Sequence, residues 1–266
     1  MNREPSGPDE NLIAPAVKLA KKLADAAREV VMGHFRKPLE IDAKPDDSPV
    51  TLADKQAEDA MRALIGDAFP AHGIIGEERM DKNPGAEFVW VLDPIDGTQS
   101  FVTGKPLFGT LIALLQRERP ILGIIDMPAL NERWIGAAGR PTLFNAEPVT
   151  VRACSGVGEA WLYATSPHMF EDADFPVFER LRKACWRTIY GAECMAYGLL
   201  ASGLVDIVCE GTMNLYDYAP MVPIIEGAGG VITDWRGNAL GMDGDGTVLT
   251  AGDAACHTAA LELLVR

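Results

Sequence analysis

Two aspartates lie three residues apart in the segment FVWVLDPIDGTQSF, which runs from Phe88 to Phe101 and begins with apolar residues. The apolar run predicts a buried strand, and Pro94 disfavours helical geometry at Asp93, so the Asp93 carboxylate should project from the end of the strand into a crevice. Asp96 is expected to follow one tight turn later. Two carboxylates this close destabilise each other unless a divalent cation lies between them, and hard oxygen donors suit Mg²⁺. The alternative is a hairpin turn, because Asp-Gly is a common turn pair.

Further acidic residues stand where a regular element is expected to stop or start. Glu77 and Glu78 in IIGEER follow a short apolar run. Asp217 in LYDYAP is expected to precede a helix whose first turn is marked by Pro220. These additional carboxylates weaken the hairpin-turn interpretation and favour a cation site.

Gly97 and Thr98 supply the second half of a phosphate site. A flexible glycine followed by exposed backbone N–H groups at a helix start can hold a phosphoryl group. The chain has no GxxxxGK[ST] segment, no GxGxxG after the first strand and no GxSxG elbow, which argues against nucleoside-triphosphate, dinucleotide and serine-hydrolase chemistry. The four histidines are scattered along the chain, so a histidine-based metal site is not expected.

The charge balance limits the partners. The chain has 24 Lys and Arg against 38 Asp and Glu, a formal net charge of −14, so it should repel a nucleic-acid backbone. An anionic small substrate would also be repelled, unless cations bound to the protein reverse the field at the site. We therefore expect no nucleic-acid partner, and a phosphorylated substrate only together with bound metal.

The composition indicates a globular protein. The 266 residues, 48% of them hydrophobic, can bury a core as one large domain or two packed smaller ones. The apolar runs are far short of the roughly 20 residues of a membrane span, and the N-terminus lacks a signal-peptide apolar region, so we expect a soluble cytoplasmic protein with no membrane partner. Five widely spaced cysteines without a CxxC pair predict buried thiols, neither disulfides nor a thiolate zinc site.

Two groups of elements are expected to position these residues. Apolar residues at helical spacing predict a helix over about 13–33 and a second one from Thr51, a plausible N-cap, to Pro70. An antiparallel meander of strands should follow, at 88–92, 108–115, 121–127 and 133–137. Later strands are expected at 161–164, 186–190, 205–209, 231–233 and 248–251, and later helices near 174–184, 193–201, 219–227 and from 254.

This pattern predicts an α+β protein with two parts. The first, 1–145, is an N-terminal α+β subdomain that carries the GEE and DPIDGT segments, and the second, 146–266, is a C-terminal α/β subdomain with substrate-facing loops. Residues 1–10 are expected to be disordered.

The motifs in combination resemble the inositol monophosphatase family: GEE, then DPIDGT followed by SF, then a late YD before EGAGG. They are spread over the whole chain, and DPIDGT with GEE upstream is highly specific for this family. The resemblance implies a five-layered αβαβα sandwich, Mg²⁺-dependent hydrolysis of a phosphate monoester by metal-assisted in-line displacement, inhibition by Li⁺, and a homodimer.

The family's site residues can be carried over to the matching positions. The resemblance implies that two or three Mg²⁺ ions are bound by Glu77, Asp93, Asp96, Asp217 and the backbone carbonyl of Ile95. It implies that Asp54, in SPVTLAD, activates water together with Thr98, with Glu77 as a third catalytic residue. Asp54 also has the spacing of a capping box with Thr51, with Asp in place of Glu or Gln, and both readings can hold together. Substrate contacts are implied at Asp96, Gly97, Thr98, Ser166, Gly191, Ala192, Glu193, Glu210 and Asp217.

The substrate is suggested by three longer phrases: DPIDGTQSFVTGKPLFGTLIALL, TSPHMF and LYDYAPMVPIIEGAGGVITDW are most similar to the histidinol-phosphatase branch of the family. That similarity favours histidinol phosphate, whose imidazole and protonated amine would suit carboxylates such as Glu193 and Glu210. Branch members tend to have Gly-Asp-Cys-Tyr where this chain has Ala192-Glu193-Cys194-Met195, so Glu193 could also be a helix first-turn residue favoured by the macrodipole. Inositol 1-phosphate, another small phosphate ester, or a regulatory role without catalysis are the alternatives.

Overall fold

The computed structural model describes residues 10–38, 41–43 and 49–265, which form eight α-helices, two short 3₁₀-helices and fourteen strands within those ranges. The helices are α1 (Glu10–His34), α2 (Leu52–Ala68), α3 (Thr98–Val102), α4 (Phe175–Ala184), α5 (Met195–Ala201), α6 (Leu215–Tyr218), α7 (Met221–Gly227) and α8 (Ala254–Leu264), and the 3₁₀-helices are Val157–Glu159 and Pro167–Met169.

Most strands belong to two large sheets. A seven-stranded sheet has the spatial order β3-β4-β5-β6-β7-β8-β9. Its strands are β3 (Gly73–Gly76), β4 (Phe88–Asp96), β5 (Gly109–Gln116), β6 (Arg119–Met127), β7 (Glu132–Ala137), β8 (Leu143–Phe144) and β9 (Glu147–Pro148). β3 runs parallel to β4, and the other pairs are antiparallel, which confirms the predicted meander from β4 to β7.

The second sheet has the order β11-β10-β12-β14-β13. Its strands are β10 (Trp161–Ala164), β11 (Arg187–Tyr190), β12 (Ile207–Glu210), β13 (Val231–Thr233) and β14 (Val248–Ala251), and a separate hairpin joins β1 (Ile41–Ala43) to β2 (Pro49–Thr51). β10 pairs in parallel with β11 and β12, whereas β12, β14 and β13 pair antiparallel.

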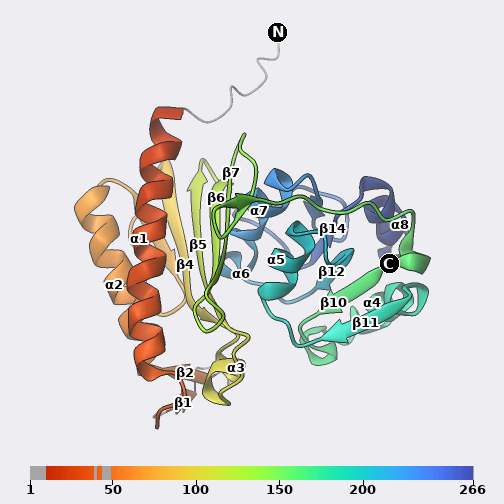
Figure 1. Ribbon diagram of the computed structural model, residues 1–266, viewed down its shortest axis with the longest axis horizontal. Helices are drawn as coiled ribbons and strands as arrows, with labels where there is room; N and C mark the ends of the chain where they lie inside the picture. The colour runs from red at the N-terminus through yellow and green to blue at the C-terminus, as the bar shows by residue number, and fades with distance from the viewer. Residues whose placement is uncertain (1–9, 39–40, 44–48, 266) are drawn as a thin grey trace.

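The layers follow the predicted αβαβα order (Figure 1). Helices α1 and α2 cover one face of the seven-stranded sheet, α5, α6 and α7 lie between the two sheets, and α4 and α8 cover the far face of the five-stranded sheet. The prediction of an α+β fold with five layers is confirmed. The division into two subdomains at residue 145 remains a proposal, and the seven-stranded sheet itself reaches Pro148 through β9.

Strand β4 shows why a strand of the seven-stranded sheet has apolar residues at consecutive positions. Val89 and Val91 pack in the cluster that includes the middle helices, whereas Trp90 and Leu92 pack in the cluster that includes α1 and α2. Because successive strand side chains point to opposite faces, a strand covered on both sides needs apolar residues at every position. The alternation therefore places β4, which carries Asp93 and Asp96, between two helical layers.

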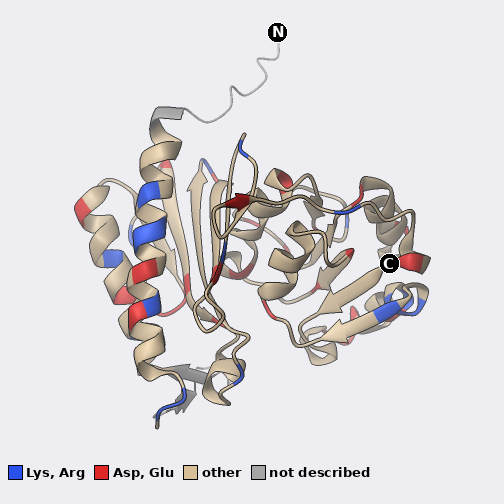
Figure 2. Ribbon diagram, viewed as in Figure 1, with Lys and Arg blue, Asp and Glu red and all other residues tan. Residues whose placement is uncertain are grey.

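The two N-terminal helices pack closely, since α1 buries the small residues Ala16, Ala20, Ala24 and Ala27. Acidic residues are interspersed with the basic ones along α1 (Figure 2), so no continuous basic stripe is visible there.

None of the helices within the described ranges is long and apolar enough to span a bilayer. All five cysteines fall in those ranges and carry free thiols, four of them buried and Cys185 half-buried, as predicted.

Several predicted boundaries need correction. Strand β4 does not end at Asp93 but continues to Asp96. Asp217 precedes the predicted helix, α7, whose N-cap is Pro220, but it also lies inside the short helix α6, which was not predicted. The helix expected over 193–201 begins at Met195, the strand expected from Trp186 begins at Arg187, and the one expected from Val205 begins at Ile207. The predicted disorder of residues 1–10 falls almost wholly outside the described residues, and Glu10 already belongs to α1.

Candidate active site

Three aspartates from two distant parts of the chain converge where the seven-stranded sheet meets the middle layer of helices. One carboxylate oxygen from each of Asp93, Asp96 and Asp217 lies within 4.8 Å of the others. The first two come from β4, and the third comes from α6 in the middle layer. The structure thus brings together three of the four carboxylates predicted to bind metal.

An irregularity in β4 allows Asp93 and Asp96 to reach the same site. Residues three apart on a regular strand point to opposite faces. Here Asp93 pairs with Leu111 and Asp96 pairs with Gly109, so β4 has one residue more than β5 over this stretch. Such a β-bulge changes the side-chain direction of the residues that follow it. The bulge, and not the predicted tight turn, turns Asp96 toward Asp93.

The three carboxylates repel one another in the absence of a cation. Burial raises the pKa of Asp93 well above its usual value, and the neighbouring charges of Glu77, Asp96 and Asp217 raise it further. Burial also raises the pKa of Asp217 well above its usual value and that of Asp96 to about 6. A divalent cation would reverse this penalty, and a set of carboxylate oxygens is the donor set that Mg²⁺ prefers. The residues therefore fit the predicted Mg²⁺ site.

Glu77 follows β3, next to the strand that carries the aspartates. Its backbone N–H donates to the carbonyl of Leu92 at 3.2 Å, which ties the start of the GEE segment to β4. Its side chain is near enough to Asp93 to contribute to the raised pKa of that residue. The position agrees with the predicted ligand role, which stays a prediction.

The predicted capping box at the start of α2 is present. The Asp54 carboxylate accepts from the Thr51 backbone N–H at 2.8 Å and from the Thr51 hydroxyl at 2.6 Å, and Thr51 Oγ1 accepts from Ala53 N–H. Asp54 is only 1% exposed. Burial raises its pKa, although the two bonds from Thr51 act in the opposite direction, and Glu77 adds a smaller upward contribution. The two bonds from Thr51 fix the orientation of the Asp54 carboxylate, and this cap is compatible with a part in catalysis.

Gly97 links the aspartates to the short helix α3. It has φ +77°, a left-handed conformation that glycine adopts without strain, and a Cβ there would lie 2.9 Å from Glu193 Cγ. Asp-Gly therefore marks a helix N-cap, not a hairpin turn. Thr98 begins α3, and its hydroxyl donates to the Ile95 carbonyl at 3.0 Å.

Two adjoining pockets contain most of the predicted substrate contacts. A pocket of about 440 Å³ is lined by Glu77, Gly97, Thr98, Gln99, Thr165, Ser166, His168, Met169 and Glu193. A smaller one of about 180 Å³ is lined by Asp96, Thr165, Met169, Glu193, Cys194, Tyr197, Glu210, Gly211, Thr212, Met213, Asp217 and Met221. Thr165, Met169 and Glu193 belong to both. Gly191 and Ala192 were predicted to contact the substrate but line neither pocket, and Ala192 is buried.

Glu193 does not lie in the first turn of α5, as its helix-dipole interpretation required. It precedes the N-cap Cys194 and has φ 48°, an uncommon conformation for a residue with a side chain. Its carboxylate accepts from Ser100 Oγ at 2.6 Å and lies 3.5 Å from Lys105 Nζ. The helix-dipole interpretation is therefore wrong in its geometry, and Glu193 instead bridges to the segment that follows Gly97.

Glu210 is buried at the end of β12, where its carboxylate accepts three hydrogen bonds. It accepts from the Thr165 backbone N–H at 2.9 Å, from the Thr165 hydroxyl, and from Tyr197 Oη at 2.8 Å. Burial raises the pKa of Glu210 to about 7, even though these hydrogen bonds favour the ionised form. The carboxylate therefore titrates near neutral pH.

Sequence reasoning missed several residues of the site. Thr165 and Tyr197 hold Glu210, and Ser100 and Lys105 hold Glu193. Thr165 stands in the TSPHMF phrase and Lys105 in the TGKPLFG stretch, but neither has a spacing that predicts its partner. Cys194 was also missed, and its backbone N–H donates to Asp96 Oδ2 at 2.9 Å.

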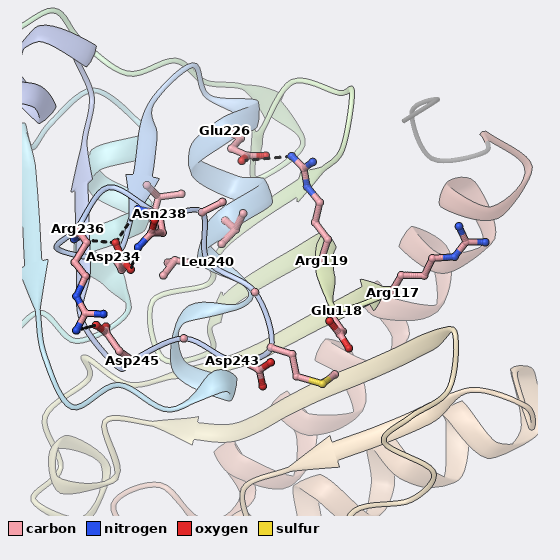
Figure 3. Close-up of a pocket in the computed structure, with 16 residues that line it drawn as sticks. Arg117, Glu118, Arg119, Glu226, Asp234, Arg236, Asn238, Leu240, Asp243 and Asp245 are labelled. Atoms are coloured by element: carbon pink, nitrogen blue, oxygen red, sulfur yellow. Dashed lines mark hydrogen bonds and ion pairs between the residues drawn. The ribbon is translucent and has the colours of Figure 1, made fainter. Parts of the chain in front are cut away.

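A larger groove lies elsewhere, between the β5–β6 turn and the segment 234–245 (Figure 3). It measures about 580 Å³ but contains none of the predicted site residues. Its arginines already face carboxylates: Arg119 lies 4.0 Å from Glu226 and Arg236 lies 3.4 Å from Asp245. We therefore place the candidate active site at the two pockets beside the aspartates, which are lined by predicted site residues, and not at the larger groove.

The sandwich and its cluster of three aspartates define a class of phosphatase, and comparison with known proteins identifies the family. Residues 13–266 match the inositol monophosphatase family, and the chain belongs to it. It is 46% identical over 272 residues to the "Bifunctional phosphatase IMPL2, chloroplastic" of Arabidopsis thaliana, covering 99% of this chain and 79% of the relative. It is 35% identical over 239 residues to a histidinol-phosphatase of Chlorobaculum parvum, covering 89% and 92%.

The fold agrees with this assignment. A solved inositol monophosphatase from Zymomonas mobilis superposes with a TM-score of 0.88 at 44% sequence identity, covering 95% of this chain and 98% of that chain. The resemblance that the motifs indicated is thus confirmed at the level of the family and the fold.

Proposed function

We propose that this protein is a Mg²⁺-dependent phosphate monoester hydrolase whose substrate is histidinol phosphate. The observation that carries the hydrolase assignment is the convergence of Asp93, Asp96 and Asp217 within 4.8 Å, beside a pocket lined by Glu77, Gly97 and Thr98. Glu77, the three aspartates and the Ile95 carbonyl would hold two or three Mg²⁺ ions. When bound, these ions would supply positive charge that offsets the acidic surface, attracts the phosphate and lowers the pKa of water.

The residues of this chain have distinct parts in the proposed reaction. Gly97 and Thr98 would orient the phosphoryl group at the start of α3. The Thr98 hydroxyl donates to the Ile95 carbonyl, so its lone pairs can accept a hydrogen bond from the attacking water. Asp54 would accept the proton of that water, and its raised pKa brings its proton affinity nearer to neutral pH. The water oxygen bonds to phosphorus as the phosphorus–oxygen ester bond breaks, and the proton that Asp54 accepts balances the proton that the leaving alkoxide takes up, so ester and water give alcohol and phosphate.

The preference for histidinol phosphate rests on the carboxylates of the pocket. Glu193 and Glu210 line the smaller pocket beside Asp96, where a protonated amine or imidazole would be attracted and an uncharged polyol would not. Three relatives named histidinol-phosphatase, at 34–35% identity, support the same choice. For this substrate, histidinol phosphate and water give histidinol and inorganic phosphate.

The second candidate substrate is inositol 1-phosphate. It is favoured by the 44% identity to the Zymomonas mobilis structure, which is called an inositol monophosphatase. Glu210 would then accept hydrogen bonds from ring hydroxyls. A regulatory role without catalysis is less favoured, because every predicted metal ligand from Glu77 to Asp217 is present in this chain.

The test is a comparison of kcat/KM for histidinol phosphate, inositol 1-phosphate, fructose 1,6-bisphosphate and a 3′,5′-nucleotide bisphosphate, with Mg²⁺ and with a chelator. We expect Mg²⁺-dependent phosphate release that is fastest for histidinol phosphate. A higher kcat/KM for inositol 1-phosphate would make it the substrate in place of histidinol phosphate. The absence of phosphate release by the folded, metal-bound protein would favour the regulatory role.

The homodimer also stays a proposal. Strand β11 lies at the edge of the five-stranded sheet, and the neighbouring Trp186 is 52% exposed while Ile189 and Tyr190 are each 38% exposed. An exposed edge strand with apolar side chains is a suitable surface for association. Sedimentation of the purified protein at several concentrations would test it.

A further inference from the structure

Helix α2 carries a second buried carboxylate four residues after Asp54. Glu58 is 0% exposed. Its Oε2 accepts from the backbone N–H of Glu78 at 2.8 Å, and its Oε1 accepts from Arg62 Nε at 2.6 Å. Asp54, Glu58 and Arg62 are spaced four apart, so they follow one row along the helix. This row faces the segment that contains Glu77.

The structure leaves little freedom between this row and the GEE segment. A Cβ on Gly76 would lie 2.1 Å from Glu58 Oε1 and 2.8 Å from Arg62 Nη2, so a side chain there would displace the Glu58 carboxylate or the Arg62 guanidinium. Arg62 Nη2 also donates to the carbonyl of Arg79 at 3.2 Å. The two side chains thus bind the backbone at Glu78 and Arg79, directly after Glu77.

Glu77 is consequently fixed from two directions. Its own N–H is bonded to Leu92 in β4 at 3.2 Å, and the next N–H, of Glu78, is bonded to Glu58 in α2 at 2.8 Å. The β3–β4 pairing ends at Gly76. The Glu77 N–H still bonds to β4, and from Glu78 onward the contact with α2 holds the backbone of the segment.

We propose that Glu58 is a positioning residue, which sets the direction of the Glu77 side chain toward the aspartates and fixes it relative to Asp54 on the same helix. The proposal rests on the proposed function, in which Glu77 binds metal and Asp54 activates water. Glu58 itself touches neither the metal site nor the pockets lined by Glu77 and Asp96. Partners that orient a metal ligand typically change metal affinity or activity by roughly 10–100-fold when they are removed.

The test is the Glu58→Gln variant of the full chain. The neutral amide can accept only one of the two bonds, and its NH₂ group would face the N–H of Glu78 or the guanidinium of Arg62. We expect Mg²⁺ affinity, measured by titration calorimetry without substrate, to fall roughly tenfold or more. We expect kcat at saturating Mg²⁺ to fall much less than the affinity. A purely structural role would lower the melting temperature of the metal-free protein and leave the Mg²⁺ affinity of the folded fraction unchanged.

Asp59→Asn is the matched control. Asp59 is the next residue on α2, pairs with Arg79 on the same segment through a 2.9 Å hydrogen bond, and has a side chain that is 54% exposed. This variant removes the same charge, so an effect of net charge alone would weaken Mg²⁺ binding equally in both variants. We expect the Mg²⁺ affinity of Asp59→Asn to stay within about twofold of the unmodified protein.

Arg62→Lys provides a second measurement if Glu58→Gln does not fold. Lysine keeps the positive charge beside Glu58 but cannot bond both Glu58 and the Arg79 carbonyl with the same planar fork. We expect a smaller loss of Mg²⁺ affinity in the same direction. Unchanged affinity in every variant that folds would overturn the positioning role. Because calorimetry needs no turnover, a protein that binds Mg²⁺ but hydrolyses none of the esters would refute the proposed function and still test Glu58.

Discussion

Replacing Glu193 by glutamine separates two roles for a carboxylate that lines both active-site pockets. If Glu193 binds the cationic end of histidinol phosphate, Glu193→Gln should lower kcat/KM for that substrate and leave an uncharged monoester almost unaffected. If Glu193 serves only to bridge Ser100 and Lys105, both substrates should be affected equally. The measured quantity is therefore the ratio of the two losses, with β-glycerophosphate as the uncharged monoester.

The size of the expected ratio follows from the contacts of the carboxylate. A hydrogen bond to a charged group contributes about 1.5–3 kcal/mol, which is roughly 10- to 150-fold in kcat/KM. Glu193 Oε1 already accepts from Ser100 at 2.6 Å, and Oε2 lies 3.5 Å from Lys105. One oxygen, partly neutralised by the ammonium, is left for the substrate. We therefore expect the lower end of the range, a ratio of about ten.

Ser100→Ala is the matched control, because it removes the 2.6 Å bond to Glu193 without removing the charge. A loss of the bridge alone should change both substrates by the same factor in Ser100→Ala and in Glu193→Gln. A ratio near one in Glu193→Gln would refute the specificity role of Glu193 and leave Glu210, the other glutamate that lines the smaller pocket, as the candidate.

Three further predictions concern the metal site and Glu210. Asp93→Asn should abolish Mg²⁺-dependent turnover and leave the circular dichroism spectrum intact, while the metal-free melting temperature should rise because one of the mutually repelling carboxylates is gone; unchanged turnover at saturating Mg²⁺ would remove Asp93 from the site. Excess Ca²⁺ should inhibit, since Ca²⁺ binds at longer distances and in less regular geometry than Mg²⁺, and full activity with Ca²⁺ alone would contradict the proposed metal geometry. The raised pKa of Glu210, about 7 against 4.5 when exposed, favours the protonated folded form, so its contribution to stability is full below pH 4.5 and is lost as the pH rises to about 7. The free energy of unfolding in chelator should thus fall over that interval by about 3 kcal/mol more in the unmodified protein than in Glu210→Gln; equal pH slopes would show that the pKa is not raised.

The elements that sequence patterns predicted best are those with a strong local signal. The helical spacing of apolar residues predicted α1 and α2, and the Thr51-Asp54 spacing predicted a capping box whose two reciprocal bonds are present. Strands β13 and β14 were predicted with their observed bounds. These features depend on residues a few positions apart, so the local sequence contains most of the information needed.

The errors arose where distant segments meet. Asp93 was expected at the end of a strand, but pairing with β5 extends β4 to Asp96 through a bulge. Glu193 was assigned to a helix turn by its neighbours in sequence, but its partners are Ser100 and Lys105, 93 and 88 residues away along the chain. Local propensity has no access to such partners, because they depend on which elements pack together.

The amino-acid sequence by itself determined the donor types of this site and the family, because DPIDGT and GEE place carboxylates, a carbonyl and a glycine in short contiguous segments. Only the tertiary structure decided which carboxylates share a centre. The packing of α6 against the seven-stranded sheet brings Asp217 within 4.8 Å of Asp93 and Asp96, and the packing of α2 against the GEE segment brings Glu58 to Glu78. The physical reason is that burial and mutual repulsion act through distance in space, whereas spacing along the chain fixes distance only within a single element.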